Sequence, residues 1–100
     1  MHDYRLSLIT IDFIKKVVAF QIDTWKEVLY LRVDNFSLFK FSWDLDDLDP
    51  WIDFVVKKNN YGKEDSLLIY MLNWFIFEVQ SKKILIDEKF KKTIAVQNYK

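Results

Sequence analysis

The sequence predicts a single α+β domain, residues 1–100, in which an antiparallel β-sheet of about five or six strands carries one packed helix. Apolar and polar residues alternate with period two in several segments, and another segment begins with a helix-capping signal. A chain of 100 residues has room for one hydrophobic core. Because 51% of the residues are apolar, a folded chain is expected rather than a disordered one. A small all-α bundle is the alternative fold.

The N-terminal segment, residues 6–22, is rich in Ile, Val and Thr, which favour strands. The same segment places Phe13, Ile14, Val17 and Val18 at the spacing of a helical face. We predict two strands in this segment, and a helix is the alternative.

The alternation is clearest between Glu27 and Trp43. Apolar side chains occupy every second position on both sides of Asp34-Asn35, a pair of residues that tolerates turn conformations. We therefore predict a β-hairpin with its turn at this pair. The apolar positions of the two strands are Leu29, Leu31, Val33, Phe39, Phe41 and Trp43.

The predicted helix spans residues 49–60. Asp49 can accept hydrogen bonds from the free N–H groups of a first turn, and Pro50 suits the first helical position. Trp51 and Val55 would then share one face of the helix. The Asn-Asn-Tyr-Gly sequence around the end of this segment would terminate it.

Two segments of the C-terminal half allow more than one interpretation. Residues 67–79 are apolar on both faces, which fits a fully buried strand and a core helix equally well. Residues 84–96 alternate and are expected to form a strand, although Phe90 and Ile94 would also suit a helix. A turn at residues 80–82 would fold this strand back on the preceding segment.

An acidic run between the predicted hairpin and helix is the candidate functional site. Residues 44–53 contain five Asp, but a calcium loop needs Gly and Glu where Asp49 and Val55 stand. The run could simply be a solvated loop that caps the helix. We predict instead an anionic docking surface, because Trp is enriched at the centres of interfaces and a charged rim steers association. Its partner-binding residues would be Trp43, Asp44, Asp46, Asp47, Asp49, Trp51 and Asp53.

The sequence offers few residues that could carry out catalysis. There is no Cys, and the only His is His2, next to the start of the chain. We therefore predict a protein that binds rather than an enzyme, with no catalytic residue, no metal site and no cofactor. A small metal-dependent hydrolase that uses the Asp44–Asp53 cluster is the alternative, and an adaptor or assembly subunit is another.

The charge and hydropathy patterns restrict the partners and the location. The net charge is zero, with a balance of −4 over residues 1–53 and +4 over residues 54–100, so direct nucleic-acid binding is not expected. The longest apolar stretch, residues 67–77, is too short to span a bilayer, so no membrane association is expected. The absence of Cys and of a secretory signal predicts a cytoplasmic protein.

In general character the chain resembles the small immunity proteins of bacterial polymorphic and contact-dependent toxin systems. The shared features are its size, the lack of catalytic groups, the many aromatic residues and the acidic stretch from Trp43 to Asp53. The resemblance implies a cytoplasmic protein that binds one cognate toxin and blocks its active site. Because many such toxins are nucleases with basic grooves, an acidic loop could fill such a groove.

Overall fold

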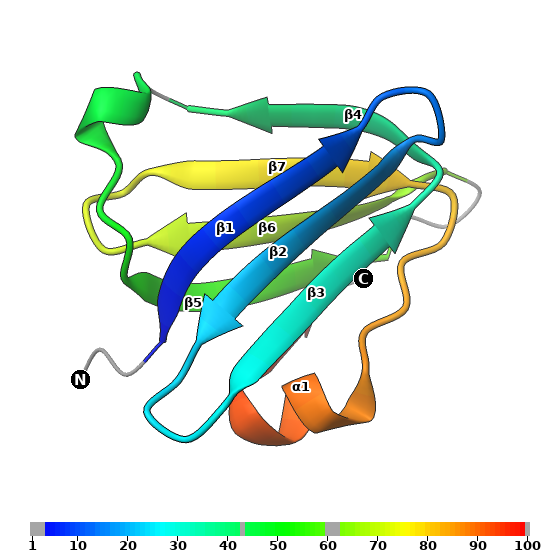
Figure 1. The fold of residues 1–100 in the computed structure, drawn as a ribbon. Coiled ribbons are helices and arrows are strands. Elements are labelled where there is room, and N and C mark those ends of the chain that lie inside the picture. The colour runs from blue at the N-terminus through cyan, green and yellow to red at the C-terminus, as the bar shows by residue number, and fades with distance from the viewer. Residues whose placement is uncertain (1–3, 43, 60–62, 100) are drawn as a thin grey trace.

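The computed structural model describes residues 4–42, 44–59 and 63–99, and over these residues the chain forms eight strands in two sheets (Figure 1). One sheet has three antiparallel strands, in the order β1 (Arg5–Asp12), β2 (Val17–Asp23) and β3 (Val28–Asp34). The other has five strands, in the order β4 (Phe36–Phe41), β7 (Ile76–Ser81), β6 (Asp65–Met71), β5 (Ile52–Lys58) and β8 (Val96–Tyr99). Within this second sheet β5 and β8 are parallel, and the other pairs are antiparallel.

The three-stranded sheet lies obliquely across one face of the five-stranded sheet, and the hydrophobic core fills the space between them (Figure 1). On β2 and β3 every second side chain is buried, as the sequence alternation predicts. Aromatic rings link the two layers: Phe20 of β2 lies against Phe77 of β7, with ring centroids 5.9 Å apart. The sheets therefore depend on the same core.

Two ambiguous segments prove to be strands. Residues 6–22 contain most of β1 and β2, as predicted, and residues 67–79 contain parts of β6 and β7. The second segment is interrupted by a turn at Leu72–Trp74, so it is neither one strand nor a helix. Over the described residues the fold is mostly β with one short α-helix, and the all-α alternative is not supported.

The predicted hairpin between β3 and β4 is wrong. The strands themselves exist, but β3 pairs with β2 and β4 pairs with β7 in the other sheet. Only Asn35 separates them, and its φ of 54° turns the chain out of one sheet and into the other. Alternation defines where a strand lies, but it carries no information about which strand will be its neighbour.

The predicted helix at residues 49–60 is also wrong, because this segment contains β5. The Asp49 carboxylate accepts a hydrogen bond from the Trp51 N–H (3.0 Å), but the residues that follow are extended. Ile52, Val55 and Val56 are β-branched and buried. Backbone pairing with β6 on one side and β8 on the other outweighs the local capping signal.

The helix lies instead inside the predicted C-terminal strand, as α1 (Glu88–Thr93). The Asp87 side chain caps it by accepting a hydrogen bond from the Lys89 N–H (3.1 Å). Phe90 and Ile94, the pair at helical spacing, are both buried. The chain does not turn back on β7 at residues 80–82, since β7 continues to Ser81 and the last strand, β8, pairs with β5.

Ser81 supports the crossing between the two sheets. It is 1% exposed, and its hydroxyl lies within hydrogen-bond distance of the carbonyls of Asp34 (2.7 Å) and Asn35 (3.2 Å). Replacing Ser81 with Ala leaves these acceptors without their donor, so we expect the free energy of unfolding to fall by about 1–3 kcal/mol. Denaturant unfolding measures this loss. Ser7→Ala is the matched control, because the Ser7 hydroxyl makes one exposed hydrogen bond, and a loss as large in that variant would contradict the role given to Ser81.

Candidate functional site

The two sheets meet where β1 begins and the chain enters β5, at the end of the sandwich on the left of Figure 1. The N–H of Leu6 donates to the Pro50 carbonyl (2.7 Å), and the N–H of Ile52 donates to the Tyr4 carbonyl (2.9 Å). These bonds hold the segment before β5 against the first strand. The acidic run predicted from the sequence is thus fixed at this end of the molecule.

Backbone contacts continue from this junction into both sheets. Trp51 forms an isolated bridge with Arg5, and Arg5 in turn pairs with Asp23 on β2. On the other side, the N–H of Leu72 donates to the Trp51 carbonyl (3.1 Å). Neighbouring strands lie about 4.8 Å apart, so the turn after β2 and the turn after β6 are brought to the same end as the acidic run.

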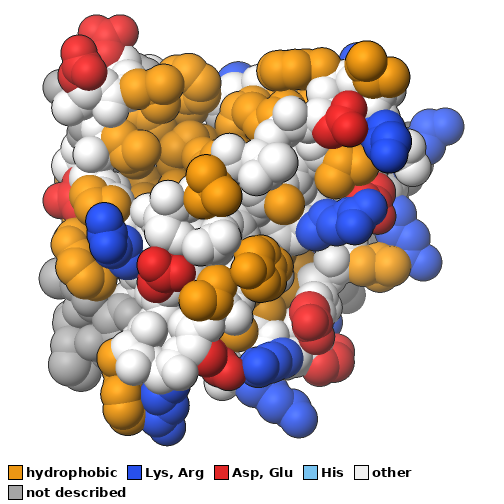
Figure 2. All heavy atoms as spheres, viewed as in Figure 1, with side chains coloured by type: hydrophobic (Ala, Val, Ile, Leu, Met, Phe, Trp, Pro, Cys, Tyr) orange, Lys and Arg blue, Asp and Glu red, His pale blue; other side chains and the backbone are white. Residues whose placement is uncertain are grey.

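Three exposed tryptophans lie along this end on separate segments: Trp25 in the β2–β3 turn, Trp51 before β5 and Trp74 in the β6–β7 turn. Their exposed fractions are 79%, 37% and 75%. Leu45, in the short 3₁₀ helix η1 (Leu45–Asp47), is also exposed. We call the surface formed by these residues and by the carboxylates of Asp44, Asp46, Asp49 and Asp53 the tryptophan end. Figure 2 shows hydrophobic side chains gathered beside acidic groups where η1 lies.

Trp74 occupies a backbone position that usually belongs to glycine. The Trp74 N–H donates to the Met71 carbonyl (3.1 Å), and the Met71 N–H donates to the Phe75 carbonyl (2.7 Å). This is a three-residue hairpin loop, whose last residue adopts the left-handed conformation. Trp74 has a φ of 69°, which is unfavourable for a bulky side chain. The turn therefore holds an exposed indole in a strained conformation that glycine would relieve.

Trp25 is presented by an ordered turn as well. The Thr24 hydroxyl oxygen accepts hydrogen bonds from the N–H groups of Lys26 (3.2 Å) and Glu27 (3.0 Å). The Lys26 ammonium lies 4.7 Å from the centre of the Trp25 ring, so this cation is held over the ring face. Glu27 is in turn bound to Lys89 of α1 at 3.0 Å. The ring is exposed although the backbone beneath it is fixed.

The acidic residues predicted from the sequence have different environments. Asp44, Asp46 and Asp53 are exposed, and Asp49 is half-buried with one oxygen bound to the Trp51 N–H. Trp43 and the side chain of Asp47 lie outside the described residues. Among the side chains that the structure describes, no three His, Asp or Glu come together as a metal site would require.

Sequence reasoning missed Trp25 and Trp74. Trp74 lies in a segment that is apolar on both faces, and Trp25 lies between the strands predicted at residues 6–22 and the hairpin predicted at residues 27–43. Turn-forming residues mark both positions in the sequence: Asn73 lies within that apolar segment, and Asp23-Thr24 precedes Trp25. These signals could have revealed the two turns that carry Trp74 and Trp25. Exposure itself follows only from the pairing of the strands.

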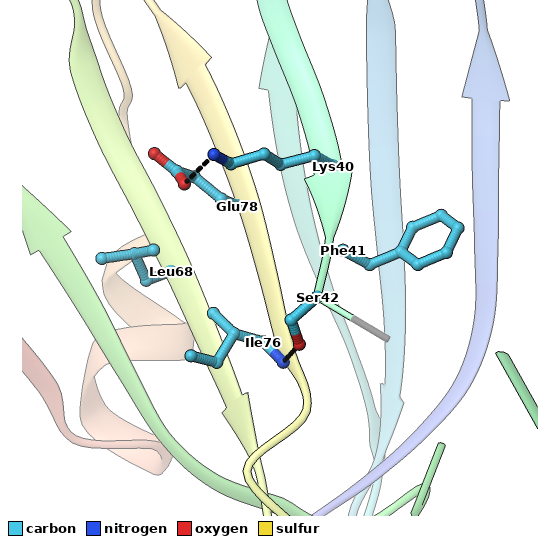
Figure 3. A pocket seen from close by; sticks show the side chains of 6 residues that line it. All are labelled: Lys40, Phe41, Ser42, Leu68, Ile76 and Glu78. Atoms are coloured by element: carbon cyan, nitrogen blue, oxygen red, sulfur yellow. Dashed lines mark hydrogen bonds and ion pairs between the residues drawn. The ribbon is translucent and has the colours of Figure 1, made fainter. Parts of the chain in front are cut away.

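A separate hollow of about 350 Å³ lies on the outer face of the five-stranded sheet (Figure 3). Lys40 and Glu78 form an ion pair across it (3.4 Å), and the Ser42 hydroxyl oxygen accepts a hydrogen bond from the Ile76 N–H (2.9 Å). In Figure 3 the Phe41 ring points away from these groups. The polar groups of the hollow already satisfy one another, so the tryptophan end is the better candidate site.

Comparison with models of protein families, with curated protein sequences and with solved structures finds no match for this chain. In the part of the chain that the structure describes, no helix is both long enough and apolar enough to cross a membrane.

Proposed function

We propose that this chain is a protein-binding domain that docks its tryptophan end against a basic surface of one partner. The observation that carries the proposal is the exposure of Trp25 and Trp74 on two ordered turns of the same end. Burying a large aromatic side chain is strongly favourable, and Trp is enriched among the residues that dominate interface energies. Rings kept in solvent on rigid turns are ready to bind without a large ordering cost.

The charge at this end of the molecule favours a basic partner. Asp44, Asp46 and Asp53 are exposed there. The cations nearby include Arg5, Lys26 and Lys89, but Lys26 already lies over the Trp25 ring and Lys89 is paired with Glu27. A surface of this kind has apolar anchors with an acidic rim, which steers a positively charged partner toward it.

The specific role that we propose is that of a toxin-immunity protein. Such a protein covers the active site of one cognate toxin and performs no catalysis itself. An acidic surface with apolar anchors fits the basic groove of a nuclease, where carboxylates take the place of phosphates. The same surface would also serve an adaptor, so the two roles must be separated by what the partner does.

Affinity capture tests the proposal. Wild type and the Trp25→Ala plus Trp74→Ala variant serve as paired baits in extracts of the native cell. We expect one basic protein to be retained by the wild type and lost by the variant. The captured protein is then expressed in growing cells to distinguish an immunity protein from an adaptor. Growth arrest that is relieved when this chain is co-expressed supports immunity. Retention by both baits would exclude the tryptophan end as the docking surface.

Reversing the acidic rim should act mainly on the rate of association. We expect Asp44→Lys plus Asp46→Lys to slow association with the captured partner by about tenfold or more, because opposite charges no longer attract at a distance. The dependence of the rate on salt should also weaken. Stopped-flow mixing at several salt concentrations measures both effects.

The control for this variant carries the same change of net charge at the opposite end. Asp34→Lys plus Glu64→Lys alters two residues that line a hollow near the β3–β4 crossing. Association should be nearly unaffected in this control. If both variants slow association equally, net charge alone is responsible and the rim has no special role.

A further inference from the structure

The β1–β2 turn, residues 13–16, presents a second apolar surface at the end of the sandwich opposite to the tryptophan end (Figure 1). Phe13 is 66% exposed and Ile14 is 94% exposed. Turns of this kind usually contain Gly, Asn, Asp, Pro or Ser. Here the turn reads Phe-Ile-Lys-Lys, so two large apolar side chains, both mostly exposed, stand where polar residues or glycine are usual.

This turn is ordered. One carboxylate oxygen of Asp12 accepts hydrogen bonds from the N–H groups of Ile14 (3.0 Å) and Lys15 (2.9 Å). The Phe13 ring lies edge-on against Phe36, with centroids 6.5 Å apart. The Phe36 N–H donates to the Lys16 carbonyl (3.0 Å), which ties the turn to the start of β4. Ile14 is therefore held outward by a fixed backbone.

The charge around the turn is positive. Lys15 and Lys16 are exposed, and neither forms an ion pair with any residue that the structure describes. The carboxylates at this end already have partners. Asp12 accepts the hydrogen bonds that cap the turn, and Asp34 forms an ion pair with Arg32 at 2.7 Å. Glu64 is hydrogen-bonded to Ser37. Exposed Lys82 and Lys83 line the adjacent hollow, and Figure 2 shows Lys and Arg side chains along this side.

We propose that the β1–β2 turn of one molecule docks on the tryptophan end of a second copy, so that molecules associate head to tail. The two surfaces have opposite charge, and each displays apolar anchors. They lie at opposite ends of a molecule whose longest extent is 37 Å, so one molecule cannot join its own two ends. A head-to-tail contact that does not close into a ring builds open chains.

This inference rests on the surface used in the proposed function, and it adds a regulatory consequence. A partner that covers the tryptophan end excludes the turn of a second copy, so partner binding and self-association compete. The acidic surface is then covered in the absence of the partner. The contact must be weak enough for the partner to displace it.

Sedimentation velocity of the purified chain tests the proposal. The average mass should rise with protein concentration at roughly 0.05 M salt and fall toward the monomer at roughly 0.5 M salt, where charges are screened. Two variants each disrupt one docking surface. Ile14→Ser plus Lys15→Glu disrupts the surface of the β1–β2 turn, and Trp74→Ala plus Asp46→Lys disrupts that of the tryptophan end. Each variant alone should remain monomeric at every concentration.

Mixing the two variants gives the decisive observation. One retains an intact tryptophan end and the other an intact turn, so an equimolar mixture should form dimers and nothing larger. A wild type that stays monomeric throughout, variants that still associate, or a mixture that stays monomeric would each overturn the proposal. Thermal unfolding of both variants checks that they are folded, which is expected because all four altered side chains are exposed.

Two further measurements separate the alternatives. Phosphatidylserine vesicles that bind the wild type but not the turn variant, with the wild type monomeric, would assign the turn to an anionic lipid surface instead. The turn variant should still capture the protein partner, since its tryptophan end is intact. Self-association without any captured partner would leave this inference standing and overturn the proposed function alone.

Discussion

Replacing Phe77 with Ala is expected to lower the free energy of unfolding by about 3–5 kcal/mol, which is a large part of the stability of a domain of this size. Phe77 is 1% exposed. Its ring lies within 6.3 Å, centroid to centroid, of Phe20, Phe39, Phe41 and Phe75. Truncation therefore leaves a cavity at the point where the two sheets share their core. Denaturant unfolding followed by tryptophan fluorescence measures the loss.

Trp25→Ala is the matched control for this core variant. It removes an aromatic side chain that is 79% exposed, so stability should change by no more than about 0.5 kcal/mol. A Phe77 variant that is no less stable than this control would mean that the two layers do not pack as described. Far-ultraviolet circular dichroism should show mainly β structure in both proteins.

Replacing Trp74 with Gly is expected to stabilise the fold while it weakens partner binding. A left-handed conformation costs a non-glycine residue roughly 1–2 kcal/mol. Glycine relieves that cost but adds about 0.5–1 kcal/mol of backbone entropy in the unfolded chain. We therefore expect a net gain of up to about 1.5 kcal/mol in the free energy of unfolding. Binding should weaken by about 2 kcal/mol or more, close to 30-fold, as for an aromatic interface anchor.

Trp74→Ala separates the two effects. Alanine removes the indole but keeps the cost of the left-handed backbone, so binding should weaken as much as in the glycine variant without the gain in stability. Calorimetric titration with the captured partner and denaturant unfolding provide both quantities. If Trp74→Gly lowers stability and leaves affinity unchanged, the tryptophan contributes to the fold and not to binding.

These two residues illustrate opposite uses of aromatic side chains in one small protein. Phe77 stabilises the contact between the sheets, whereas Trp74 is exposed at a cost in both hydration and backbone strain. Strained and exposed positions of this kind are typical of functional sites, because stability alone would not retain them.

Part of the candidate site follows from the sequence. The acidic run and Trp51 stand in one short segment, and the structure fixes that segment on the surface next to β1. The contribution of Trp25 and Trp74 could not be read in the same way. They lie far from the acidic run along the chain, and only the pairing of β1 with β2 and of β5 with β6 brings them to one end.

The sequence by itself determined where the first four strands, β1 to β4, lie, because alternation such as that along β2 and β3 reflects one buried and one exposed face, and this pattern is local. Tertiary structure alone decided the strand partners. Backbone hydrogen bonds are the same for any pair of strands, so nothing in residues 27–43 distinguishes a hairpin from a crossing between sheets. It also decided that the Asp49 capping signal would precede a strand, because β6 pairs with β5 from Ile52 to Lys58 and β8 pairs with its second half, from Val55 to Lys58.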